Sequence, residues 1–126
     1  MIHPAATFGA GQRAAVEAQV GVIVCAGVRL TNHIEIGKFS IFNINATVGH
    51  DAVIGAFVNI SPGANVSGNV DIGERCWIGT GAAINQGAPG GKLVIGNDTV
   101  IGSGSVVVRA CDPGSVYVGI PARKIK

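Results

Sequence analysis

Apolar side chains recur at every sixth position along most of this chain. From Val24 to Ile84 an aliphatic or aromatic residue keeps this register without a break, and after a wider gap the series resumes at Ile95 and reaches Val107. A period of six matches neither the repeat of a helix nor the simple alternation of a strand. It indicates short strands joined by regular corners, with three hexapeptides to each triangular coil. The pattern therefore predicts an all-β chain that folds as a parallel solenoid.

Two further columns accompany the apolar one. The position after each apolar residue is mostly glycine or asparagine, as at Gly37, Gly55 and Gly79, and we expect it to supply the positive φ of a tight corner. Four positions after each apolar residue stands a mostly small one, such as Ala46 or Ala52. A large side chain in one column and a small one in the next suit a narrow interior.

Three segments depart from the period. Residues 1–17 fit it poorly and should form an irregular start. Between Ile84 and Ile95 the spacing is 11 instead of six, which predicts five inserted residues and an exposed loop near 87–92. Residues 108–126 follow the last repeat, contain a Pro-Gly turn and should form a short C-terminal cap. We expect residues 1–126 to make a single domain.

Composition narrows the setting of the protein. The formal net charge of +2 is too small to favour nucleic acid as a partner. No apolar run approaches a membrane-spanning length, so no membrane insertion is expected, and the first residues do not form a signal peptide. Cys25, Cys76 and Cys111 form no zinc-binding spacing, so we expect no metal site and free thiols in the cytoplasm.

The period also predicts which residues stack. Residues one coil apart should lie about 5 Å from each other, as in neighbouring strands. Asn32, His50 and Gly68 then line one corner, which places a potential base beside a backbone amide that no side chain obstructs. Pro62 and Thr80 line a second corner, and Ser103 joins them once the five inserted residues are removed. A base, an amide donor and a groove are the parts that acyl transfer from a thioester requires.

Five short segments carry a narrower signal: residues 43–46, 49–51, 60–64, 67–70 and 118–123. With the hexapeptide repeat, their order and spacing resemble the hexapeptide-repeat acyltransferases. Within that family they are similar to the bacterial sugar acetyltransferases of the sialic-acid O-acetyltransferase and bacillosamine-type N-acetyltransferase group. The resemblance implies a left-handed parallel β-helix, a homotrimer, and acetyl-CoA as cosubstrate in the groove between two subunits. It implies a nucleotide-linked amino sugar or a sialic-acid-type sugar as the acceptor.

The resemblance also implies roles for single residues. His50 would be the general base in direct transfer, and Asp51 would be its acidic partner. Asn43 matches an active-site asparagine, and Gly68 matches a glycine whose amide faces the thioester oxygen. The positions where the family contacts CoA are Asn59, Thr80 and Ser103. Asn59 stands where the family often has histidine, so that contact differs.

Other functions stay open at this point. A non-catalytic scaffold or binding subunit would explain the repeat, although not the His50–Asp51 pair. A metalloenzyme of the γ-carbonic-anhydrase type would need three histidines on one metal, and His33 and His50 have no suitably spaced third partner. Members of the sugar acetyltransferase group usually begin with a nucleotide-sugar-binding domain. Here the resemblance starts at His3-Pro4, so either the chain is a fragment or the acceptor is bound without that domain.

Several finer points also have two interpretations. Amine and hydroxyl acetylation cannot be told apart from these residues. The loop near 87–92 either walls the groove or is a surface insertion. His33 stacks under Asp51, where it is either a surface residue or an orienting one. Trp77 either packs in the trimer interface or forms the floor of the acceptor pocket. Three late cations either meet CoA phosphates or are solvated charges: Arg109, Arg123 and Lys124.

Overall fold

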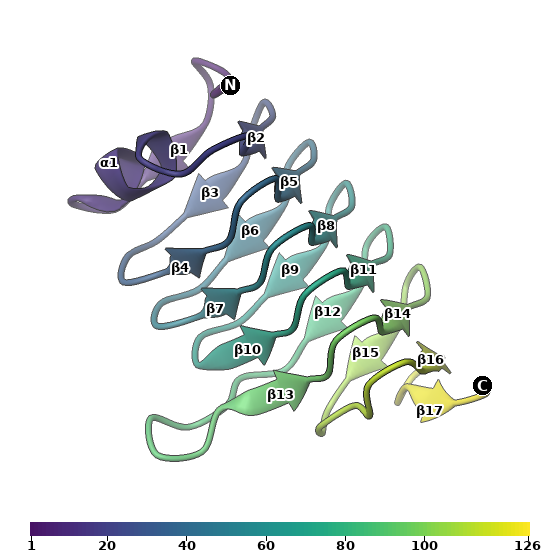
Figure 1. The fold of residues 1–126 in the computed structure, drawn as a ribbon. Helices are drawn as coiled ribbons and strands as arrows, with labels where there is room; N and C mark the ends of the chain where they lie inside the picture. Colours follow the sequence, from purple (N-terminus) through teal and green to yellow (C-terminus); the bar gives the residue numbers. More distant parts are fainter.

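The computed structural model describes residues 1–126, which wind into a β-solenoid with three sheets whose strands are parallel except for the last strand of the third sheet (Figure 1). The first sheet contains β1 (Thr7–Phe8), β3 (Arg29–Leu30), β6 (Thr47–Val48), β9 (Asn65–Val66), β12 (Ala83–Ile84) and β15 (Val106–Val107). The second contains β4 (Glu35–Ile36), β7 (Val53–Ile54), β10 (Val70–Ile72) and β13 (Leu93–Ile95). The third contains β2 (Ile23–Val24), β5 (Ile41–Phe42), β8 (Asn59–Ile60), β11 (Trp77–Ile78), β14 (Val100–Ile101), β16 (Val116–Val118) and β17 (Arg123–Lys124).

The chain visits the three sheets in turn, so each coil lies on the one before it. In Figure 1 the nearer segments run from β4 to β5 and from β7 to β8 while the axis advances toward the C-terminus, which makes the winding left-handed. Val48 of β6 pairs with Val66 of β9, one coil of 18 residues later. Asp71 of β10 pairs with Val94 of β13 at a separation of 23 residues. The expected parallel β-helix and its five-residue insertion are both confirmed.

The repeating apolar residues fill the interior of this prism. Ile60, Ile72 and Ile78 are fully buried, and so are the small residues Ala46 and Ala52 between neighbouring sheets. Together with the other buried apolar side chains they form one continuous cluster that runs along the axis. Because each coil buries its apolar residues mainly against the next, stability comes from the stacking of neighbours.

The glycine column serves a different purpose from the one expected. Gly37, Gly55 and Gly79 do not adopt positive φ; the residues two positions later do, as at Phe57 (φ 59°) and Gly81 (φ 67°). A Cβ atom on Gly79 would lie 2.6 Å from the carbonyl oxygen of Ile101 and 2.6 Å from the backbone nitrogen of Ser103, both in the next coil. The expectation of positive φ at these positions was wrong, and the glycines are needed because stacked coils approach too closely for a side chain.

Gly79→Ala should lower the free energy of unfolding by about 1–3 kcal/mol, because the added methyl group overpacks two stacked coils. Urea unfolding measures this loss. Gly90→Ala is the matched control, since a Cβ there meets no atom within 4 Å and the backbone is not left-handed. Equal stability of the two variants would contradict the close-approach explanation.

The solenoid is closed at its N-terminal end by a short helix that the period did not predict. Helix α1 (Gln12–Glu17) lies beside β4, the edge strand of the second sheet. The buried Gln12 side chain accepts a hydrogen bond from Ile34 N (2.9 Å) and donates one to Ile34 O (3.0 Å). At the other end β17 pairs antiparallel with β16. No helix of the structure is long and apolar enough to cross a membrane.

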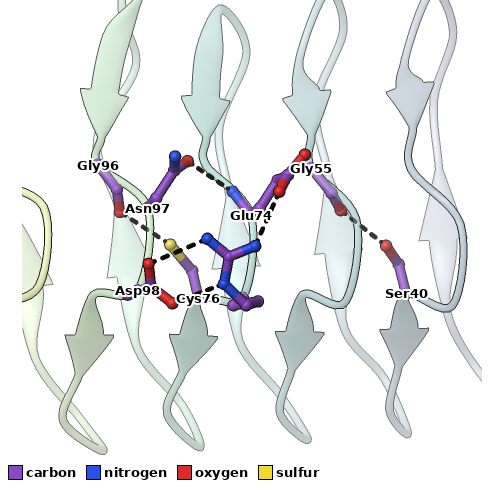
Figure 2. A network of polar contacts seen from close by, with 8 residues as sticks. Ser40, Gly55, Glu74, Cys76, Gly96, Asn97 and Asp98 are labelled. Atoms are coloured by element: carbon purple, nitrogen blue, oxygen red, sulfur yellow. Dashed lines mark hydrogen bonds and ion pairs between the residues drawn. The ribbon is translucent and has the colours of Figure 1, made fainter.

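A polar network ties successive coils together at the corner between the second and third sheets (Figure 2). The Arg75 guanidinium donates hydrogen bonds to Asp98 at 2.7 and 3.1 Å and to Glu74 at 2.9 Å. The hydrogen bond from Arg75 lowers the pKa of Asp98. Just inside this corner the Cys76 thiol donates to the Gly96 carbonyl at 3.0 Å, and burial raises its pKa. Cys76 is therefore a core residue with little thiolate character.

Candidate active site

His50 and Asp51 lie at the corner between the first and second sheets, which we call the His50 corner. The chain turns there after β6, and Asp51 takes the left-handed conformation that the turn requires (φ 57°). Its backbone N–H donates to Asn32 O in the coil below at 3.2 Å. The His50 carbonyl accepts from Asn69 N in the coil above at 2.9 Å. Both residues are thus fixed by backbone contacts on two sides while their side chains stay about half exposed.

The two side chains form a hydrogen-bonded pair. His50 Nδ1 lies 2.8 Å from Asp51 Oδ2, and this contact is the main cause that lowers the pKa of the Asp51 carboxyl, against a smaller effect of burial. An ionised carboxylate can only accept hydrogen bonds, so Nδ1 carries the proton of the neutral imidazole. His50 Nε2 is then left as a bare nitrogen that can accept a proton.

Gly68 lies directly above the imidazole, as the stacking of coils predicted. A Cβ atom on Gly68 would be 2.6 Å from His50 Nε2, and no group of the chain accepts a hydrogen bond from the Gly68 N–H. Glycine is required here because any side chain would occupy the position of the ring. The corner therefore combines a proton acceptor with a free amide donor, which are two of the parts needed for attack on a thioester.

The other candidate residues lie on a different part of the prism. Asn43 Nδ2 donates to Asn59 Oδ1 at 3.1 Å and to Ile60 O at 3.0 Å, so the two asparagines form one unit on the third sheet. Thr80 and Ser103 are exposed at the corner between the third and first sheets. They stack on each other because Ile78 pairs with Ile101, and each lies two residues after its member of this pair. We call this the Thr80 corner. One chain thus divides the candidate residues between two corners.

Trp77 lies on the same outer face as these asparagines. In β11, Trp77 pairs with Asn59 of the preceding coil and with Val100 of the following coil, and the residue is 54% exposed. Ile41 pairs with Asn59 one coil before Trp77, so it lies in the same row along the solenoid axis. This face therefore presents apolar side chains to its surroundings. Farther along the solenoid, Arg109 and Arg123 line a cavity of about 250 Å³ beside the C-terminal strands.

Comparison with known proteins identifies the family. No family model matches the chain, but many solved structures do. The chain superposes on WeeI from Acinetobacter baumannii AYE with a TM-score of 0.89 and 37% identity, covering 98% of this chain and 57% of WeeI. The chain matches the hexapeptide-repeat acyltransferases.

Two further structures extend this family match. Perosamine N-acetyltransferase from Caulobacter crescentus, a variant in complex with CoA and GDP-perosamine, matches with a TM-score of 0.87 and 34% identity, over 99% of this chain and 55% of that protein. The acetyltransferase domain of PglB from Neisseria gonorrhoeae FA1090, in complex with acetyl coenzyme A, matches with a TM-score of 0.85 and 35% identity, over 98% and 56%. The chain spans just over half the length of these hexapeptide-repeat acyltransferases.

The sequence period missed one residue of the His50 corner. Lys92, the last residue of the insertion, is half-buried and donates a hydrogen bond from its Nζ to the backbone carbonyl of Asp51. The only sequence signal was the insertion itself, which places extra residues above Gly68. His33 completes this side of the corner, with its Nδ1 3.9 Å from Asp51 Oδ1. The chain contains no group of three or more metal-ligating side chains.

Gly68→Ala should lower kcat by about 10²-fold, because the methyl group displaces the His50 ring from its position, and a misplacement of this size is costly in an active site. Steady-state kinetics of acetyl transfer measure the effect, and the melting temperature checks the fold. Gly90→Ala is again the matched control and should keep its kcat, since the added methyl group there has open space. An unchanged kcat in Gly68→Ala would contradict the close contact between ring and glycine.

Proposed function

We propose that this chain carries the transfer site of an acetyl-CoA-dependent sugar N-acetyltransferase. The single observation behind this proposal is the pairing of His50 with Asp51, which leaves Nε2 free beside the unbonded amide of Gly68. The solved neighbours support it, because they include an acetyltransferase domain in complex with acetyl coenzyme A and a perosamine N-acetyltransferase in complex with CoA and GDP-perosamine.

The chemistry assigns one step to each group. The nitrogen of the acceptor amine attacks the thioester carbonyl, and His50 Nε2 takes the proton that the nitrogen loses. The Gly68 N–H donates a hydrogen bond to the oxyanion that develops on the carbonyl oxygen. The carbon–sulfur bond then breaks, and the leaving CoA sulfur takes the proton back from His50. Asp51 stabilises the charged imidazole during the step.

The acceptor in this proposal is a nucleotide-linked amino sugar. One neighbour, the perosamine N-acetyltransferase from Caulobacter crescentus, was solved with GDP-perosamine, and its name and ligand favour an amine over a hydroxyl. The chain spans only part of those proteins, so the groups that bind the nucleotide are left open. The three unpaired thiols favour the cytoplasm as its location.

A homotrimer would reunite the divided residues. The Asn43–Asn59 unit and the Thr80 corner belong to one region of the prism and His50 to another, so a groove between two subunits can bring the first region of one chain to the His50 corner of its neighbour. The exposed Trp77 and its apolar row supply a surface for such contact. Sedimentation equilibrium is expected to give three times the 12.6 kDa of one chain.

An assay of CoA release tests the proposed function. The protein is incubated with acetyl-CoA and, in turn, with nucleotide-linked amino sugars, free sialic acid and serine. Turnover on an amino sugar supports the proposal, and turnover on serine or sialic acid alone would replace its acceptor class. Absence of acetyl-CoA binding would overturn the acetyltransferase function and favour a non-catalytic scaffold.

A further inference from the structure

The insertion after β12 is an ordered hairpin built onto the His50 corner. Ala88 and Gly91 exchange two backbone hydrogen bonds, of 3.1 and 3.0 Å, around the Pro89-Gly90 turn. At its base, Gly87 N donates to Gly68 O and Leu93 N donates to Asn69 O, each at 3.1 Å. The hairpin therefore rests on the two peptides that immediately overlie His50.

Lys92 extends this contact by one more coil. Its side chain passes from the hairpin to the coil of His50 and donates to the Asp51 carbonyl. The Asp51 backbone is then held at both ends, because its N–H already donates to Asn32 O in the coil below. A left-handed aspartate whose two peptide groups are both bonded has little freedom to turn, and its carboxylate direction is fixed with it.

The surroundings of Lys92 are consistent with a role in holding Asp51. The ammonium lines an open cavity of about 430 Å³ together with His33, Glu35 and Asp51. The charges of His50, His33 and Lys92 all lower the pKa of Asp51, so the lysine also favours the ionised carboxylate that the imidazole requires. His50 does not line this cavity, and the only hydrogen bond of the Lys92 ammonium goes to the Asp51 carbonyl.

We infer that Lys92 is a positioning residue: it holds Asp51, and through Asp51 it fixes the tautomer and direction of the His50 imidazole. This inference rests on the proposed function for its consequence in catalysis, but the geometry that it describes exists without substrate. The hairpin is then a brace of the active site, which accounts for an insertion that the solenoid itself does not need.

Lys92→Met tests the inference against Lys92→Arg and against Lys38→Met, a lysine at the corner between the second and third sheets whose ammonium lies 5.9 Å from the centroid of the Phe57 ring. We expect Lys92→Met to lower kcat by roughly 10- to 100-fold with little change in the KM for acetyl-CoA, because orientation and not binding is lost. Lys92→Arg should restore most of the kcat, and Lys38→Met should keep it. In an Asp51→Asn background, Lys92→Met should add almost nothing, since both act through one group.

A second readout needs no substrate. The downfield proton resonance of the His50 Nδ1–H, identified by its loss in His50→Ala, should broaden in Lys92→Met and persist in Lys92→Arg at an unchanged melting temperature. If the wild type transfers no acetyl group but the resonance depends on Lys92, the positioning role stands and the proposed function fails. If His50→Ala abolishes transfer while Lys92→Met changes neither kcat nor the resonance, the inference is overturned.

Discussion

His50→Ala is expected to lower kcat/KM for acetyl transfer by about 10²–10⁴-fold, the contribution typical of a positioned general base. In the proposed transfer the imidazole takes up the proton of the acceptor amine at Nε2, and the contacts of this corner hold no other basic nitrogen beside the Gly68 N–H. Initial rates of CoA release at saturating acetyl-CoA measure the loss. The KM for acetyl-CoA should change little, because the proton acceptor acts only in the transition state.

His3→Ala is the control for this prediction. His3 also carries an exposed imidazole, but its Nδ1 accepts a hydrogen bond from Ala5 N in the N-terminal segment and has no role in the proposed transfer. The kcat of the His3→Ala variant should equal that of the wild type. The general-base role would be refuted by a His50→Ala variant that keeps its melting temperature and most of its activity.

Ile78→Ala should lower the free energy of unfolding by about 2–5 kcal/mol, because a fully buried aliphatic side chain is replaced by a cavity. Its strand position pairs with Ile60 on one side and Ile101 on the other, so the cavity opens between three coils. Urea unfolding followed by far-UV circular dichroism measures the loss. Such a decrease is a large part of the stability of an ordinary domain.

Ile44→Ala provides the matching control for the stability prediction. Ile44 is 54% exposed at the turn after β5, so its truncation leaves no internal cavity. Its effect should stay within about 0.5 kcal/mol, as for most surface substitutions. Equal losses in the two variants would mean that the interior column does not carry the stability of the solenoid.

Much of this structure could be predicted from the sequence because a solenoid turns spacing into contact. In most folds, residues far apart in sequence meet for reasons that no simple count reveals. Here a separation of one coil places Val48 beside Val66, and the same count places His50 under Gly68. The insertion between Ile84 and Ile95 also followed from counting, since it shifts every later pairing by five residues.

The features that the six-residue period did not predict depend on how far a side chain extends and on how closely two backbones approach. Lys92 reaches Asp51 through a long flexible chain, and its contact depends on the path of the hairpin and not on the period. The purpose of the glycine column was misread because the sequence shows a small residue without showing what lies against it. Helix α1 was missed because a segment of six residues in an aperiodic start gives too weak a helical signal. In the proposed trimer, Asn43 of one subunit would approach His50 of its neighbour, and the repeat period of a single chain does not predict such a contact.

The helix at the N-terminal end has a consequence for how copies of this molecule meet. A stack of parallel coils ends in a strand edge with unpaired N–H and C=O groups, which could template the addition of another chain and the growth of fibres. The Gln12 side-chain amide forms hydrogen bonds with both backbone groups of Ile34, and Gln19 donates to Ile36 O at 3.1 Å. The β4 edge therefore has few free backbone groups that could pair with an added strand. At the opposite end, β17 runs antiparallel and breaks the ladder. The second-sheet edge near the N-terminus and the third-sheet edge near the C-terminus are therefore poor templates for a further strand, which favours contact through the sides of the prism, where the proposed groove would lie.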